Sequence, residues 1–144
     1  MATVIRAEIS PKNKYWISKH RYYELKHFCL QYPEWKKVYF ELCNENIPLS
    51  MIDAIPTDNL PNDPITQRAL MKTFYSERIK LIEKTALEAD PCLHEYLIKG
   101  VTEGRSYTYL NTVMEIPCGK DMYYDRYRKF FWLLDDLREQ NLWI

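Results

Sequence analysis

The chain has 144 residues, in which 20 Lys and Arg balance 20 Asp and Glu. This length suits one domain, or a small domain with a helical extension. Only three Gly residues occur, which argues against a sheet-rich fold with many tight turns, so we expect an all-α protein built as a helical bundle. We find no signal peptide and no apolar run near the ~18 residues that cross a bilayer. These absences predict a cytoplasmic protein that does not act at a membrane.

The zero net charge is an average over unequal segments. Residues 1–43 contain eight Lys and Arg against four acidic residues, whereas residues 44–63 contain four acidic residues and no basic one. Residues 120–130 contain four basic residues and two acidic ones. Local surfaces can therefore be positive on a neutral molecule. A neutral monomer still predicts modest non-specific affinity for DNA, reinforced by a homodimer or by a partner protein.

Residues 1–62 form the first predicted region. Residues 1–17 suit a short strand or an arm, and residues 44–62 form an acidic, Pro-rich connector. Between them, Ser18 begins one helix, and Pro33 ends it and opens a second. The spacing of three to four residues between apolar side chains predicts one buried face on each helix. These faces are Tyr22, Leu25, Phe28 and Cys29 on the first helix, and Trp35, Val38, Tyr39 and Leu42 on the second.

Residues 63–144 form the second region, which opens on a long helix. Asp63-Pro64 combines an N-cap acceptor with a proline at the first helical position, and the helix should run to about Ala89. Its stripe faces the protein core, with a dimer seam as the alternative. Asp90-Pro91 starts the next helix, which Gly104 ends. The predicted stripe of the long helix is Met71, Tyr75, Ile79, Ile82 and Ala86, widened by Leu70, Phe74 and Leu81.

The segment from Glu103 to Phe131 has the order helix, short turn, longer helix. Ser106 should cap a helix over residues 107–114, residues 115–119 form the turn, and the last helix runs over residues 120–141. That helix begins with basic and tyrosine side chains, as does a helix that enters the major groove of DNA in a helix-turn-helix. The expected apolar anchors of this unit are Leu110, Val113, Ile116, Tyr123, Tyr127 and Phe130.

The predicted DNA contacts lie at the N-termini of these two helices or around the outer face of the second. Winding the last helix at about 100° per residue places Tyr124, Asp125 and Arg128 away from its apolar stripe. Asp121 and Asp125 count against the prediction because carboxylates repel phosphate. The alternative is an amphipathic core helix with internal ion pairs. The predicted contacts to bases and phosphates are Ser106, Tyr107, Lys120, Tyr124, Arg126, Arg128 and Lys129.

The motif Glu103-Gly104-x-Ser106-Tyr107-x-x-Leu110, followed by Ile116 and a basic helix, resembles the fourth conserved region of bacterial sigma factors. Residues 90–134 and 10–39 resemble small phage and prophage proteins of Firmicutes, including late-gene transcriptional regulators of the ArpU and RinA type. The resemblance implies a sigma-like helix-turn-helix, double-stranded DNA as ligand, RNA polymerase as partner and activation of phage late genes. The chain departs from the sigma pattern at Pro117, where Ser or Thr is usual.

Two other functions stay open at this point. A phage terminase small subunit uses the same DNA-binding module in a ring, and a non-DNA phage protein would bind and inhibit a host protein. The basic, aromatic residues 12–27 are a second candidate nucleic-acid surface, with core packing of the aromatic rings as the alternative. The side chains concerned are Lys12, Lys14, Lys19, Arg21 and Lys26 for phosphate, and Tyr15 and Trp16 for stacking.

The sequence gives little support for catalysis, a cofactor or a metal. His20 and His27 have no partner nucleophile in any recognisable motif, and the glycines form no phosphate-binding loop. The four cysteines include no C-x-x-C pair, so we interpret them as reduced thiols. A zinc site from Cys92, His94 and Cys118 lacks the paired spacing of structural zinc ligands. We therefore expect no catalytic residue, no cofactor and no metal.

Overall fold

The computed structural model describes residues 12–52 and 62–140, and the statements below concern these residues. They form six α-helices and one short 3-10 helix, with no strand, which confirms the expected all-α class. None of these helices is both long enough and apolar enough to cross a membrane. The elements are α1 (Lys19–Leu30), α2 (Tyr32–Cys43), η1 (Leu49–Met51), α3 (Pro64–Ala89), α4 (His94–Glu103), α5 (Tyr107–Thr112) and α6 (Lys120–Gln140).

Local side-chain chemistry fixes most helix ends where the sequence predicted them. The Ser18 hydroxyl accepts a hydrogen bond from the Arg21 amide, and the Asp63 carboxylate accepts from the amides of Ile65 and Thr66. Such N-caps satisfy amides that have no partner within the helix. Gly104 ends α4 with φ of 67°, a left-handed conformation that glycine adopts at little cost.

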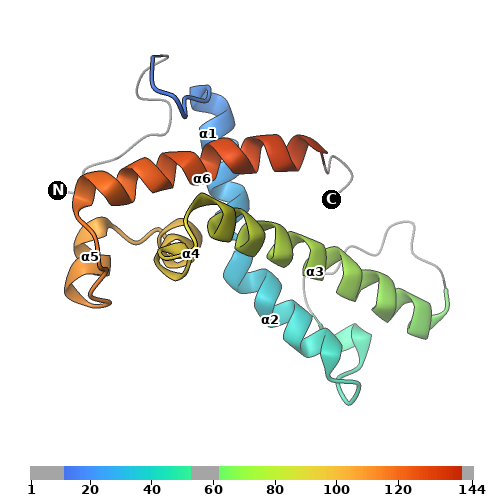
Figure 1. Cartoon of the computed structure of the whole chain (residues 1–144). Helices are drawn as coiled ribbons and strands as arrows, with labels where there is room; N and C mark the ends of the chain where they lie inside the picture. Colours follow the sequence, from blue (N-terminus) through green and yellow to red (C-terminus); the bar gives the residue numbers. More distant parts are fainter. Residues whose placement is uncertain (1–11, 53–61, 141–144) are drawn as a thin grey trace.

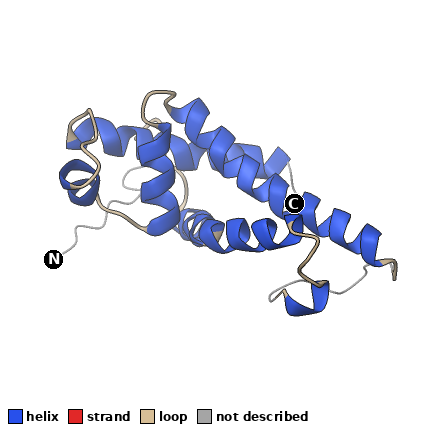
Figure 2. Cartoon of the chain, turned by 90° about the horizontal axis from the view of Figure 1, so that it is seen from below, coloured by secondary structure: helices blue, strands red, loops and turns tan. Residues whose placement is uncertain are grey.

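The helices form a body from which two helices extend as an arm (Figures 1 and 2). In the body, α6 packs on α1, α3 and α4, and α5 lies beside α4. The arm consists of α2 and the first half of α3, which pack on each other. Arg68 of α3 ties the arm together, since its guanidinium donates to the carbonyl oxygens of Leu42 at 2.7 Å and Ile47 at 2.5 Å. These carbonyls lie at and beyond the C-terminal end of α2, where acceptors are left unpaired.

One hydrophobic core runs through the body and into the arm. It includes the predicted stripe of α3, namely Met71, Tyr75, Ile79, Ile82 and Ala86, all buried. Side chains of α1 and α6 meet in this core, and Tyr22 of α1 packs edge-on against Phe131 of α6 at a centroid distance of 5.1 Å. Residues from both regions predicted from the sequence therefore contribute to a single core.

Several predicted core positions are wrong. Val113 is 60% exposed, because α5 ends at Thr112 and the chain turns away before Val113 can pack. Leu70 and Phe74 are also exposed, since they lie on the arm, where α3 is covered by α2 alone. Tyr39 is only half-buried. Of the predicted strand or arm at residues 1–17, residues 12–17 form turns and irregular backbone. Residues 1–11, and Ile55 of the connector, lie outside the described residues.

Candidate nucleic-acid interface

The connectivity of α5 and α6 is that of two helices joined by a short turn. Residues 113–119 separate them, and α5 runs steeply to α6 in Figure 1. Glu115 has φ of 55°, which lets the Ile116 amide donate back to the Leu110 carbonyl at 3.0 Å. This turn buries Ile116 against the core, as predicted, while Glu115 and Pro117 stay exposed. DNA binding by this unit stays a prediction. It requires the predicted contact side chains to be exposed and not bonded to other parts of the protein.

Three of the predicted contact residues near the turn bind other parts of the protein. The Ser106 hydroxyl accepts from the Tyr109 amide at 3.3 Å and so caps α5. The Tyr107 hydroxyl donates to the Cys118 carbonyl at 2.7 Å, and the Tyr107 amide donates to the Tyr124 hydroxyl at 3.3 Å. These bonds fix α5 and the turn against α6. They also occupy the polar groups that were expected to meet DNA.

Arg126 is likewise held within the protein. Its guanidinium bonds the carboxylate of Asp90 at 3.1 Å and that of Asp125 at 2.7 Å. Asp90 is almost fully buried and also caps the start of the next segment by accepting from the Cys92 amide at 2.8 Å. Arg126 therefore balances a buried carboxylate, and a charge of this kind is costly to leave unpaired.

The outer face of α6 is less cationic than the sequence predicted. Tyr124 was placed away from the apolar stripe, but it is half-buried and its ring packs against Tyr123 and Tyr127. Tyr107, at the start of α5, lies against this side of α6: its amide donates to the Tyr124 hydroxyl and its ring packs against Tyr123. Lys120 is exposed, and its exposed neighbour is Asp121. The predicted ridge at the start of α6 therefore presents mixed charge to solvent.

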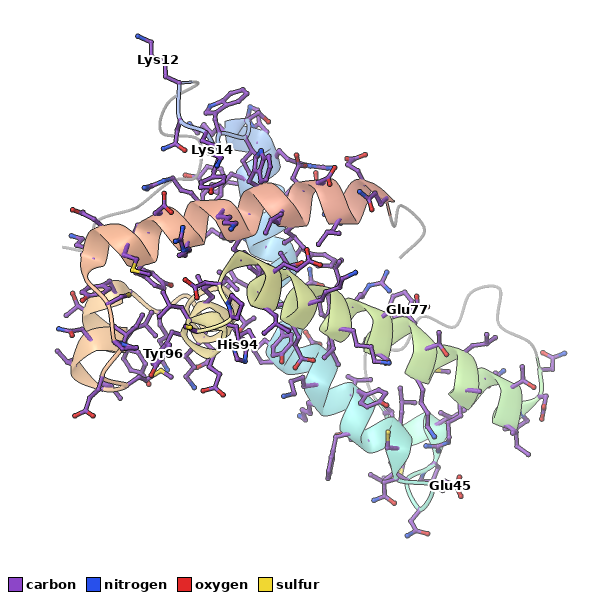
Figure 3. The ribbon with its side chains drawn as sticks, in the orientation of Figure 1. Lys12, Lys14, Glu45, Glu77, His94 and Tyr96 are labelled. Carbon is purple, nitrogen blue, oxygen red and sulfur yellow. The ribbon has the colours of Figure 1, made fainter. Side chains whose placement is uncertain are left out.

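Farther along α6, Trp132 meets the segment that precedes α1. Tyr15 is buried, and its ring lies 5.5 Å from that of Trp132. Arg128 lies one helical turn before Trp132, so both side chains leave the same side of α6. Figure 3 shows Lys12 and Lys14 on this segment, at the edge of the molecule that α6 borders. The Lys14 ammonium lies 5.3 Å from the centre of the Tyr15 ring.

We call this surface the α1–α6 patch. Residues 12–20 and 128–132, which are far apart in the sequence, together contain five Lys and Arg and no Asp or Glu. Lys12, Lys14 and Lys19 are exposed, and Arg128 and Lys129 are half-exposed. Two tryptophans, each about two-fifths exposed, lie among them. The patch consists of Lys12, Lys14, Trp16, Lys19, Arg128, Lys129 and Trp132.

Neighbouring carboxylates are largely occupied by other arginines. Arg21 of α1 forms ion pairs with Asp135 and Glu139 of α6, and the Asp135 hydrogen bond raises the pKa of Arg21. Arg138 binds Glu24 at 2.7 Å. Asp136 is exposed one turn after Trp132 and accepts from the Gln140 amide group. The charge of the patch is therefore limited on its C-terminal side by one exposed carboxylate.

Arg128 differs from the other arginines of the body. Its Nε is buried and has no hydrogen-bond partner among the described residues, whereas Arg21, Arg126 and Arg138 all bind carboxylates. A guanidinium is a strong donor with a fixed fork geometry suited to phosphate. A buried unpaired donor of this kind is uncommon and calls for an explanation.

The structure changes the membership of the N-terminal candidate surface. Tyr15 is buried, so it cannot stack on a base, and Arg21 is held by α6. Lys26 lies over the Tyr23 ring, with 5.9 Å between its ammonium and the ring centre. Trp132 was not predicted as a site residue. Its spacing of four from Arg128 was the one available signal, and only the fold places it against Tyr15.

No other cluster suggests chemistry. Among the described residues no group of His, Cys, Asp and Glu side chains is arranged to hold a metal ion. Burial raises the pKa of the Cys29 thiol, which keeps it protonated. The Tyr22 and Tyr127 hydroxyls hydrogen-bond each other at 2.6 Å, and burial raises the pKa of Tyr127 well above its ordinary value. These groups stabilise the core.

No family model matches the chain, and no curated protein or solved structure is significantly similar to it. The physical properties of the surface therefore carry the functional argument.

Proposed function

We propose that this protein binds DNA and regulates transcription of phage genes, with the α1–α6 patch supplying the main contacts to phosphate. The observation that carries the proposal is the gathering of five cationic side chains, without an acidic residue in either segment, on a chain of zero net charge. Lys and Arg that neutralise phosphates release condensed counterions, and this supplies most sequence-independent affinity. The regulatory role rests on the resemblance to sigma-like and phage regulators described above.

The connectivity of α5 and α6, two helices joined by residues 113–119, supports the same proposal. Lys120 is exposed at the N-terminus of α6, and Lys129 lies two and a half turns farther along the helix. In this arrangement the patch positions the protein on the phosphate backbone, and the start of α6 approaches the bases. Base contacts from Tyr124 and Arg126 would require their internal hydrogen bonds to break, so we assign them a structural role.

A protein partner is favoured by a second observation. Phe40 of α2, Met51 of η1 and Ile65 of α3 are each more than 70% exposed. Ile65 also lines a groove of about 790 Å³ between residues 45–49 and the first turns of α3. Exposed apolar surface of this kind marks interaction sites. RNA polymerase or a second copy of the chain are the candidates within the regulator proposal, and a host protein is the candidate if DNA binding is absent.

The decisive experiment measures duplex binding as a function of salt. Fluorescence anisotropy of a labelled 30-base-pair duplex should show affinity that falls steeply between 50 and 200 mM salt, as expected for several phosphate contacts. The double variant Lys14→Glu/Lys129→Glu should weaken binding at least about ten-fold and reduce the slope of log affinity against log salt by about two.

The matched control is Lys37→Glu/Lys80→Glu, which changes the net charge equally at exposed positions on α2 and α3. It should retain most of the wild-type affinity. Absence of duplex binding at 50 mM salt, or equal losses in both double variants, would contradict the proposal. Light scattering, which measures the mass of the particle in solution, distinguishes the regulator from the terminase small subunit. A ring of many subunits would exclude a monomeric or dimeric regulator.

A further inference from the structure

We propose that the α1–α6 patch binds unpaired bases, so that its preferred ligand is a single-stranded segment of nucleic acid whose bases stack on Trp16 and Trp132. The inference rests on the phosphate contacts of the proposed function and adds the class of ligand. It comes from the two tryptophans rather than from the charges.

These two indoles are far more exposed than the tryptophan of the core. Trp16 is 39% exposed and Trp132 is 40% exposed, whereas Trp35 is 6% exposed. A large aromatic side chain gains free energy by burial, so leaving two of them open costs stability. Surface of this kind is commonly retained for binding.

The two indoles are also held in place. Tyr15 is buried directly before Trp16 in the chain, and its ring packs against Trp132 at 5.5 Å with a tilt of 58°. The Trp16 amide donates to the Asn13 carbonyl at 3.1 Å, which fixes the turn that carries it. Aromatic rings fixed before binding lose little conformational entropy when a ligand stacks on them.

Cationic side chains lie close in the sequence to each of the two tryptophans. Lys14 and Lys19 lie on either side of Trp16 in the sequence, and Arg128 and Lys129 lie about one turn before Trp132 on α6. A site for single-stranded nucleic acid combines these two elements, a positive surface that follows the backbone and aromatic rings that stack on successive bases. The Nε of Arg128 has no hydrogen-bond partner among the described residues, so this guanidinium is a candidate donor for phosphate.

This chemistry selects an unpaired strand over a duplex. In a duplex the faces of the bases are stacked on one another, so an indole cannot reach them without unstacking a step, which costs a few kcal/mol. An apolar peptide could also pack on two indoles, but it would gain nothing from five surrounding cations. The charge of the patch therefore favours a polyanion with aromatic groups.

The test compares two oligomers that differ only in their bases. Fluorescence anisotropy is measured at 50 mM salt for labelled oligo(dT) of 20 nucleotides and for an abasic oligomer of equal length. Wild type should bind oligo(dT) more tightly. Trp16→Ala and Trp132→Ala should each weaken oligo(dT) binding about ten-fold and leave binding of the abasic oligomer unchanged. Phe40→Ala, an exposed aromatic on the arm, is the matched control and should change neither.

A second measurement needs no variant. Stacking quenches indole fluorescence, so oligo(dT) should quench the wild-type protein and the abasic oligomer should not. The stacking proposal is overturned if the wild-type protein binds both oligomers with equal affinity. It is also overturned if the tryptophan variants lose affinity equally for both oligomers, or if both oligomers quench the indole fluorescence equally. None of these results bears on the proposed function, which fails if no duplex binding exists at 50 mM salt or if the patch variants and the control variants lose duplex affinity equally.

Discussion

The two sides of α6 use aromatic residues for different purposes. On the side that faces α4 and α5, Tyr123, Tyr124 and Tyr127 form a continuous set of ring contacts, and two of their hydroxyls make hydrogen bonds within the protein. On the side that borders residues 12–20, Trp132 rests on Tyr15 and keeps two-fifths of its surface open. The tyrosine-rich start of α6 therefore stabilises the fold, and we call the side that faces α4 and α5 the closed side. The exposed Trp132 indole lies near cationic side chains, on the side that we call the open side.

This difference teaches that residue type alone does not identify a contact surface. Both sides carry aromatic and basic side chains at helical spacing. They differ in whether neighbouring elements supply partners: α5 and Asp90 satisfy Tyr124 and Arg126, whereas Arg128 has no carboxylate partner among the described residues. The predictions below test this difference.

The largest expected effect is a loss of protein stability at alkaline pH, caused by ionisation of the tyrosines on the closed side. Burial raises the pKa of Tyr123 and of Tyr127 above the ordinary value of 10.0. Because the folded pKa values are raised, their contribution is fully present below the unfolded pKa and is lost as pH rises above it. Each tyrosine should remove up to about 1.4 kcal/mol of stability per pH unit above about 10. Urea unfolding followed by circular dichroism at pH 8 to 11.5 measures this loss.

Tyrosinate absorbance at 295 nm provides the control for that experiment. The two buried tyrosines should ionise only together with unfolding. Their ionisation in a protein that keeps its helical signal would show that the closed side is open to solvent.

Gly100→Ala should cost about 3 kcal/mol of stability, because a β-carbon at this position would overlap the Tyr123 hydroxyl. Thermal and urea unfolding measure the loss. Tyr123→Phe removes the overlapping oxygen, which has no hydrogen-bond partner among the described residues, and leaves the ring carbon at an ordinary 3.4 Å. The double variant should therefore recover most of the loss, and additive losses would contradict this packing.

Tyr127→Phe should cost about 1 kcal/mol, because it removes the hydroxyl pair with Tyr22 and leaves that buried hydroxyl with one partner fewer. The readout is the urea midpoint at constant slope. Tyr109→Phe is a suitable control, since this half-buried tyrosine lies on α5, away from the hydroxyl pair. A loss in Tyr109→Phe as large as that in Tyr127→Phe would argue against a specific role for the pair.

The smallest expected change in stability is on the open side. Lys129→Ala should alter the free energy of unfolding by less than about 0.5 kcal/mol, as surface substitutions usually do. The same variant should weaken duplex binding more than Lys120→Ala does, because Lys120 has Asp121 beside it and lies outside the patch. If Lys120→Ala weakened duplex binding more than Lys129→Ala, the main contact surface would lie at the start of α6 instead.

Much of the secondary structure could be predicted because its signals are local. Asp63-Pro64, Ser18, Ser106 and Gly104 act on backbone groups within three or four residues, and each ends or begins a helix where expected. The buried stripe of α3 followed from helical periodicity for the same reason. Errors arose where a neighbour decided the outcome: Val113 stays exposed because α5 ends early, and Tyr124 is covered because α5 folds back on α6.

The sequence by itself determined that the chain is helical, where most of its helices begin, and that basic and aromatic residues concentrate before α1 and in α6. Only the tertiary structure decided which of these residues remain available. Hydrogen bonds, ion pairs and ring contacts between distant segments occupy Tyr107, Tyr124 and Arg126, while the packing of Tyr15 on Trp132 joins two cationic segments into one patch. Such pairings depend on the path of the whole chain, which local periodicity does not specify.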